Sequence, residues 1–233
     1  MCGAVILYGT RVDDVEHILG TSGFLYRSNK LMYDRATQSL WSTLWGKPVI
    51  GPLVGKNISL PPLSVVTTTW DEWRTRHPDT QVLSLDTGHA RDYGEGVAYR
   101  EYFNTDEVMF PVPHTDNRLP NKKEVLALRL LGGPPLAINV DYLSENRISH
   151  FTVGASQVVV ITDGSGENRV YASEDYRFSR TANNEIVDQH GEVWRLSEQY
   201  LTHTNGQQLV RQPAHRAFWF GWRAAYPNTR LVE

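Results

Sequence analysis

One eleven-residue segment occurs twice in this chain, and its repetition constrains the fold more than any other feature. Residues 73–83 read WRTRHPDTQVL, and residues 222–232 read WRAAYPNTRLV. The Trp, Arg, Pro and Thr are identical and equally spaced in the two copies, and both copies end in apolar residues. A shared internal period of this kind predicts an architecture of repeated supersecondary units.

The first copy carries its own signals for a helix, a turn and a strand. Thr69 stands three residues before Glu72, which is the capping box that begins a helix. Pro78 disfavours helical geometry at the preceding residue and therefore ends the helix there. The apolar stretch at residues 81–85 then predicts a short strand. By the same pattern, the second copy predicts a helix over residues 218–225 and a strand over 229–232.

A shorter match elsewhere supports the duplication. An Asp precedes a polar turn and a Trp follows it at Asp34 and Trp41, and the same arrangement returns at Asp188 and Trp194. The second spacing is one residue shorter than the first. Both halves are therefore expected to place this turn between two strands.

These matches predict a mainly β fold of the α+β type with few short helices, made of two homologous β-rich repeats. We assign the first repeat to residues 1–85, an irregular connector to 86–121 and the second repeat to 122–233. The second repeat opens with two predicted strands, 124–131 and 136–140, which have no counterpart before the first. Since the chain also starts abruptly, we expect the first repeat to be truncated at its N-terminus.

Composition excludes several classes of function. A net charge of −3 over 233 residues gives no electrostatic reason to expect a nucleic-acid partner. No apolar run approaches the roughly 20 residues of a membrane-spanning helix, so we expect no transmembrane segment. The single cysteine, Cys2, excludes an internal disulfide and any multi-cysteine metal site within this chain. The sequence itself requires no cofactor, and it leaves the oligomeric state open.

Several ordered motifs resemble one known family. They are GTSGFLYRSNKLMYDR at residues 20–35, SLWS at 39–42, GPL at 51–53, TWDEW at 69–73, HPDT at 77–80 and FWFGW at 218–222. Together they are similar to the core signature of the domain-of-unknown-function family number 3179, and the resemblance covers nearly the whole chain. It implies an extracytoplasmic location, because members of the family usually look exported.

The same resemblance bears on the one cysteine. Members of the family typically carry a Cys-Pro-Leu-Cys-Gly-Thr-like stretch before this signature, with a His-containing segment further upstream. Residues 2–3 are similar to the tail of that stretch, and the remainder is not in this chain. Thiolate and imidazole are soft metal ligands, so the resemblance implies a metal or redox site in full-length relatives, with Cys2 as one ligand. The alternative for Cys2 is a packing role.

Candidate ligand-binding residues also fall on the Asp34 turn. Asp34 and Ser39 could line a polar pocket, but an Asp in this position also caps its own turn through the backbone. The second repeat keeps the Asp and has Gln189 in place of Arg35. A residue that is present in just one copy is more typical of a binding site than of a structural role. Arg35 is therefore a better candidate than Asp34.

The connector supplies three further candidates, His89, Arg91 and Tyr93. Loops carry binding groups more often than cores do, although a polar loop rich in aromatic residues needs no ligand. Most of the seven tryptophans lie inside the repeats, where core packing is their expected role.

No catalytic motif accompanies these residues. The nucleophile elbow, the phosphate loop, the dinucleotide fingerprint and the His-Glu-x-x-His zinc motif are all absent from the sequence. Our leading hypothesis is a small-molecule or metal-binding or scaffolding module of an extracytoplasmic protein, with its site in a pocket between the repeats. The alternative is an enzyme or metal–redox site whose Cys-x-x-Cys and His residues lie partly upstream of this chain. A structural domain without a ligand is the third reading.

Overall fold

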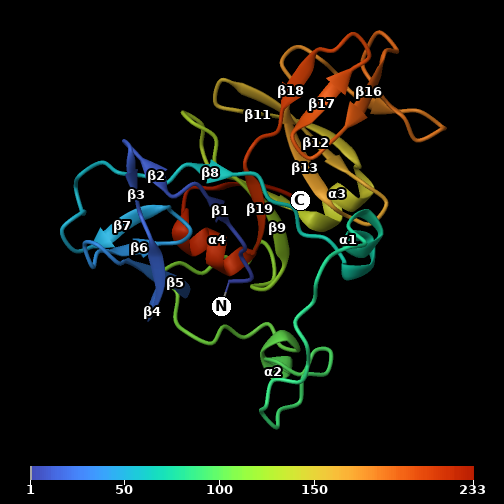
Figure 1. Ribbon diagram of the computed structural model, residues 1–233. Coiled ribbons are helices and arrows are strands. Elements are labelled where there is room, and N and C mark those ends of the chain that lie inside the picture. The colour runs from blue at the N-terminus through green and yellow to red at the C-terminus, as the bar shows by residue number, and fades with distance from the viewer. Residues whose placement is uncertain (1) are drawn as a thin grey trace.

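A four-stranded sheet from the second half of the chain occupies the middle of the molecule (Figure 1). The computed structural model describes residues 2–233. The order of this sheet is β19 (Ala214–Phe218), β9 (Glu124–Leu128), β10 (Leu136–Asn139) and β20 (Arg230–Val232). β10 and β20 are parallel, and the other neighbours are antiparallel. The sheet packs on α4 (Trp219–Ala225) and contacts α3 (Val140–Glu145).

The first half of the chain forms a separate antiparallel meander at one end of the molecule. Its strands are β4 (Leu19–Tyr26), β5 (Asn29–Asp34), β6 (Leu40–Ser42) and β7 (Lys47–Ile50). Two short ladders lie beside it: β1 (Leu7–Tyr8) with β8 (Pro62–Leu63), and β2 (Arg11–Val12) with β3 (Val15–Glu16). After β8 the chain continues without pairing into α1 (Trp70–Arg76).

Two further antiparallel sheets complete the second half. The first contains β11 (Ile148–Val153), β12 (Ser156–Thr162) and β13 (Asn168–Ala172). The second contains β14 (Ser179–Arg180), β15 (Ile186–Val187), β16 (Val193–Leu196), β17 (Tyr200–His203) and β18 (Gln208–Val210). The prediction of a mainly β protein with few short helices is confirmed.

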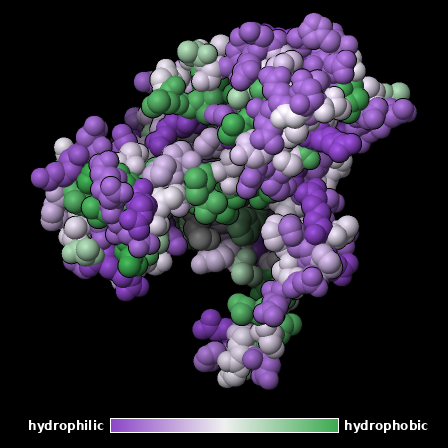
Figure 2. All heavy atoms as spheres, turned by 45° about the horizontal axis from the view of Figure 1, so that its top comes forward, coloured by the Kyte–Doolittle hydropathy of each residue, from purple (hydrophilic) through white to green (hydrophobic). Residues whose placement is uncertain are grey.

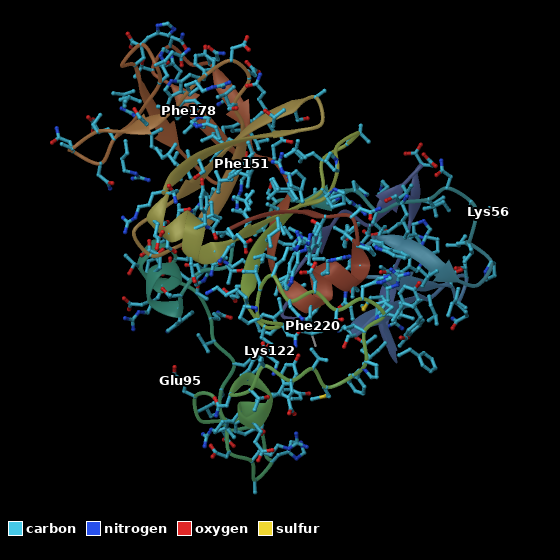
Figure 3. All side chains as sticks on the ribbon, turned by 180° about the vertical axis from the view of Figure 1, so that it is seen from behind. Lys56, Glu95, Lys122, Phe151, Phe178 and Phe220 are labelled. Carbon is cyan, nitrogen blue, oxygen red and sulfur yellow. The ribbon has the colours of Figure 1, made fainter. Side chains whose placement is uncertain are left out.

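The first part of the predicted connector is an arm that carries one short helix, α2 (Arg100–Phe103), and stands away from the rest of the molecule. Its last part returns to the body, where Leu119 lies in the core and the Trp219 indole donates to the Asp116 carbonyl at 3.2 Å. Figure 3 shows Lys122 where the end of the arm meets the body. The Lys122 ammonium donates to the backbone carbonyls of Tyr102 and Thr105, which holds the arm to the start of β9. Hydrophobic residues line the hollow between arm and body in Figure 2.

Both predicted helices form where the sequence places them. Thr69 caps α1, its hydroxyl accepting a hydrogen bond from the Glu72 amide at 3.3 Å, and the helix ends before Pro78. The strand predicted at residues 229–232 is β20. The strand predicted at 81–85 is wrong, because this segment has no neighbouring strand and Leu83 is 94% exposed.

The two helix–turn units share their local geometry. The Trp73 indole donates to the Thr80 hydroxyl and the Trp222 indole donates to the Thr229 hydroxyl, both at 2.9 Å. The residues that end the two helices have nearly the same backbone angles. They are φ −130° and ψ 69° at His77, and φ −128° and ψ 78° at Tyr226. Their environments differ: α1 buries no residue, whereas six residues of α4 are buried.

Candidate functional site

A cavity of about 400 Å³ lies within the first half of the chain. Its wall is formed by the N-terminal segment, residues 4–10, and by β4, β5 and β6 with the turn that follows β6. The lining residues are Ala4, Val5, Ile6, Tyr8, Thr10, Leu19, Asn29, Lys30, Met32, Trp41, Ser42, Thr43, Gly46 and Leu60. A mostly apolar wall with a few polar groups, at this volume, is typical of a small-molecule site.

Trp41 is the residue of this wall that a purely structural role does not explain. Its side chain is only 1% exposed, and its indole N–H has no hydrogen-bond partner. Leaving a buried donor unsatisfied costs about 1–3 kcal/mol, and indole N–H groups usually find a partner when buried. One residue of the cavity wall therefore carries a buried donor that none of the described residues uses.

The carboxylate of Asp34, in the turn that precedes Trp41, is already paired. Its Oδ2 atom lies 2.8 Å from Nδ1 of His17, and both side chains are buried. Its Oδ1 atom accepts from the Ala36 amide at 2.9 Å, in the turn between β5 and β6. The His17 ring also packs against Trp41, with 5.1 Å between ring centroids. Both carboxylate oxygens are thus occupied without Trp41.

The second half of the chain contains a similar turn, in which the aspartate pairs with the tryptophan. Oδ1 of Asp188 accepts from the His190 amide at 2.8 Å, and Oδ2 accepts from the Trp194 indole at 3.0 Å. Three rings pack on Trp194: Tyr176 and His203, each with 4.8 Å between ring centroids, and Phe178 at 5.4 Å. The two turns therefore differ in the partner of Oδ2, which is His17 in the first half and the Trp194 indole in the second.

Both aspartates are held in their charged form. Burial alone raises the pKa of Asp34, but the hydrogen bonds from His17 and the Ala36 amide outweigh it and leave the pKa below its ordinary value. The pKa of Asp188 is likewise lowered, because the bonds from Trp194 and two turn amides outweigh its burial. The two turns therefore use their carboxylates as fixed acceptors.

One cavity between the two halves of the chain is small and enclosed, at about 20 Å³. Arg129 lies at its wall, and its guanidinium donates to the Tyr226 hydroxyl at 2.9 Å. Burial lowers the pKa of His215 to about 4, so this imidazole is neutral at pH 7, and its Nε2 atom has no partner. This volume holds one water molecule. A second hollow between the halves is larger, at about 430 Å³, and is lined by Leu60 and Pro61 from the first half and by Arg129 and Leu130 from the second.

A wider hollow of about 670 Å³ lies on the second half. Its charged groups already pair with one another: Arg76 reaches from α1 to Glu167 at 2.8 Å, and Arg169 binds Glu198 at 2.7 Å. Arg169 also binds Asp163 and Glu167. This ion-pair network holds α1 against the second half and leaves few charges for a ligand.

The structure brings two of the sequence-predicted site residues together. Asp34 and Ser39 belong to one turn, in which the Asp34 amide donates to the Ser39 carbonyl at 2.8 Å and the Ser39 hydroxyl accepts from the Leu53 amide. Both are buried and neither lines the cavity. Arg35 is exposed beside them, with its guanidinium over the Tyr33 ring.

Cys2 lies apart from this turn, in the core beside α4. A side chain at Gly221 would collide with it, since a Cβ there would come within 2.2 Å of the Cys2 Cβ. Burial raises the pKa of the Cys2 thiol, which disfavours the thiolate that metal binding requires. In residues 2–233 no group of three or more His, Cys, Asp or Glu side chains is placed to hold a metal ion.

The three connector candidates are exposed on the arm. The Tyr93 hydroxyl bonds to the Thr87 hydroxyl at 2.7 Å, which is a contact within the arm. His89 and Arg91 do not line the cavity either. The connector and the Asp34 turn therefore do not form a common site in this structure.

Sequence reasoning missed both His17 and the role of Trp41. The sequence contained part of the signal, because the Asp–turn–Trp pattern occurs both at Asp34 and Trp41 and at Asp188 and Trp194. Nothing in the sequence brings His17 to Asp34, since this contact depends on how β3 and β4 lie against the turn.

The two tryptophans give a matched test. Replacing Trp194 by Phe leaves Oδ2 of Asp188 without its donor, so we expect a loss of about 1–3 kcal/mol in the free energy of unfolding. Replacing Trp41 by Phe removes a donor that has no partner, so we expect a change near zero or a small gain. Urea unfolding of both variants measures the difference. Equal losses in the two variants would contradict the assignment of a free indole to Trp41.

Acid should weaken the contribution of Asp34. Because its pKa is lower in the folded protein than in the unfolded chain, its charge stabilises the fold above the ordinary carboxyl pKa, near 3.9. That contribution disappears as pH falls through the lowered pKa. We therefore expect Asp34→Asn to be clearly less stable than the natural protein at pH 7, with the gap closing below about pH 4. A gap that stays constant from pH 7 to pH 3, measured by urea unfolding, would show that the charge contributes nothing.

Comparison with known proteins gives one match. The family model described as "Protein of unknown function (DUF3179)" matches residues 1–229, essentially the whole chain. Neither the curated proteins nor the solved structures contain a match. In residues 2–233 there is no helix of the length and hydrophobicity needed to cross a membrane. On the extent of the family match, the chain belongs to the DUF3179 family of proteins of unknown function.

Proposed function

We propose that this protein binds a small molecule in the cavity beside Trp41. The observation that carries the proposal is that Trp41 lines this cavity while its buried indole N–H has no partner among residues 2–233. A fold stable enough to carry this cost is expected to recover it when a ligand supplies the missing acceptor.

The wall indicates the chemistry of the ligand. An indole N–H is a donor only, so it selects an acceptor such as a carbonyl or carboxylate oxygen. Most of the remaining wall is apolar, which suits a hydrocarbon or aromatic body. Asn29 and Thr43 bind each other at 2.7 Å and Thr43 binds the Lys30 carbonyl, so these polar groups are largely committed to one another. The ligand class is a compact, mainly apolar molecule with one strong acceptor.

The proposal includes the duplication predicted from the sequence. Matching hydrogen bonds in the two halves support it. The Leu60 amide donates to the Gly46 carbonyl at 2.8 Å, and the Arg211 amide donates to the Gln199 carbonyl at 3.0 Å. On this view the second repeat keeps the Asp–Trp bond as a structural contact. The first repeat uses the same turn to present a free donor, and the ligand cavity lies inside that repeat.

The two other parts of the hypothesis stay predictions. An extracytoplasmic location rests on the family resemblance alone. A metal–redox function rests on cysteine and histidine residues outside this chain, and the burial of Cys2 in the core gives it no support here. No observation in the described residues favours an enzyme over a binding module.

A fragment screen tests the proposed site. The library consists of small aliphatic and aromatic carboxylates, amides and ketones, and thermal shift and NMR detect binding. We expect a subset to raise the melting temperature and to shift resonances of the residues that line the cavity. In the Trp41→Phe variant these compounds should bind about tenfold more weakly, corresponding to the loss of one hydrogen bond.

Two controls sharpen the test. Trp194→Phe removes the matching indole N–H from the second half, and at a temperature where it is folded it should leave ligand affinity unchanged. Met32→Trp fills the cavity and should abolish binding. The proposal fails if no compound binds the natural protein, or if compounds bind equally well to the Trp41→Phe and Met32→Trp variants.

A further inference from the structure

The unit formed by α1 and its flanking segments is exposed where the matching unit of the second half is buried. Trp70 and Trp73 are 51% and 39% exposed, whereas Trp219 and Trp222 are fully buried. The local geometry of the two units is the same, including the indole-to-threonine bond across the turn. The difference therefore lies in what covers each unit.

The cover of α4 is the β9–β10 hairpin. Val125 and Ala127 on β9 and Ala137 on β10 form one apolar cluster with the two tryptophans of α4. β9 pairs with β19, the strand that enters α4, and β10 pairs with β20, the strand that leaves it. The hairpin thus bridges the two segments on either side of the helix and covers the helix between them.

The two matching segments of the first half, on either side of α1, pair with no strand in residues 2–233. Residues 64–67 enter α1 and residues 81–84 follow it, and in the described chain neither belongs to a strand or makes a backbone hydrogen bond to one. Their apolar side chains are Val65, Val66, Val82 and Leu83. Val65 and Val66 are half-buried, whereas the other two are 68% and 94% exposed. Unpaired extended backbone of this kind is a template for an added strand.

The residues of α1 are suited to contact a covering element on one face of the helix only. It keeps the two tryptophans that in α4 face the hairpin, three residues apart on one side of the helix. Gly221 of α4 packs on Cys2, and the matching position in α1 is Glu72, which binds Arg76 at 2.7 Å. The tryptophan face has therefore been retained where the other apolar positions have become charged.

We infer that the surface made by residues 64–67, the Trp70–Trp73 face of α1 and residues 81–84 binds a two-stranded β-hairpin supplied by polypeptide outside residues 1–233. Its first strand would run antiparallel to 64–67, as β9 does to β19. Its second strand would run parallel to 81–84, as β10 does to β20. Small apolar side chains of the Val and Ala type would face the tryptophans. The inference rests on the paired geometry of α1 and α4 and is independent of the ligand cavity.

The test supplies a hairpin of known chemistry. A second copy of residues 121–140, the β9–β10 hairpin, is joined through a flexible Gly/Ser linker to the N-terminus of the full chain, which gives it an effective concentration on the order of millimolar. Hydrogen–deuterium exchange of the amides at 64–67 and 81–84 is compared with the unlinked protein. We expect exchange to slow at least tenfold in both segments, and acrylamide quenching of tryptophan fluorescence to decrease.

Matched variants identify the contact. Leu83→Pro removes an amide donor inside the proposed parallel pairing and should abolish the protection, whereas Leu85→Pro, beyond it, should not. Unchanged exchange in both segments of the linked protein would overturn the inference. So would a homodimer of the unlinked chain in which these amides are already protected, because the occupant would then be a second copy.

Discussion

The hydrogen bond between His17 and Asp34 determines how the first half of this protein differs from the second. Each half places an aspartate in a tight turn and a buried tryptophan beside it. In the second half the Trp194 indole donates to the Asp188 carboxylate at 3.0 Å, so this donor is satisfied. In the first half the imidazole occupies the same oxygen at 2.8 Å, and the indole of Trp41 is left as a buried donor. The partner of this one carboxylate oxygen is therefore the difference between the two turns, an imidazole in one and an indole in the other.

The same asymmetry appears on a larger scale around the two helices. α4 is covered by its own hairpin and forms the centre of the molecule, where Trp219 and Trp222 are fully buried. α1 repeats the turn and the indole bond, yet it is held mainly by the ion pairs of Arg76 with the second half. One unit is therefore complete within the chain, and the other presents its apolar face outward.

The parts of the fold that depend on local chemistry could be predicted from the sequence. Thr69 and Pro78 begin and end α1 through neighbouring backbone groups, so their effect does not require the rest of the structure. The strand at residues 81–85 was predicted on the same pattern as β20 and does not form. A strand is stable only with a partner, and this segment has none among the residues that the structure describes. Likewise, the sequence marks Asp34 and Trp41 as repeated residues, but the choice of His17 as the partner of Asp34 is a tertiary contact.

The comparison of the two turns predicts that His17 and Trp41 compete for Oδ2 of Asp34, and the indole proton of Trp41 reports on this directly. In His17→Phe the ring packing on Trp41 is kept, but Oδ2 of Asp34 loses its donor. Proton NMR of the indole N–H groups should then show the Trp41 resonance moving downfield toward that of Trp194, with slower exchange against solvent, because it gains the bond that its counterpart already makes. An indole resonance of Trp41 that is unchanged between the natural protein and the variant would contradict the account.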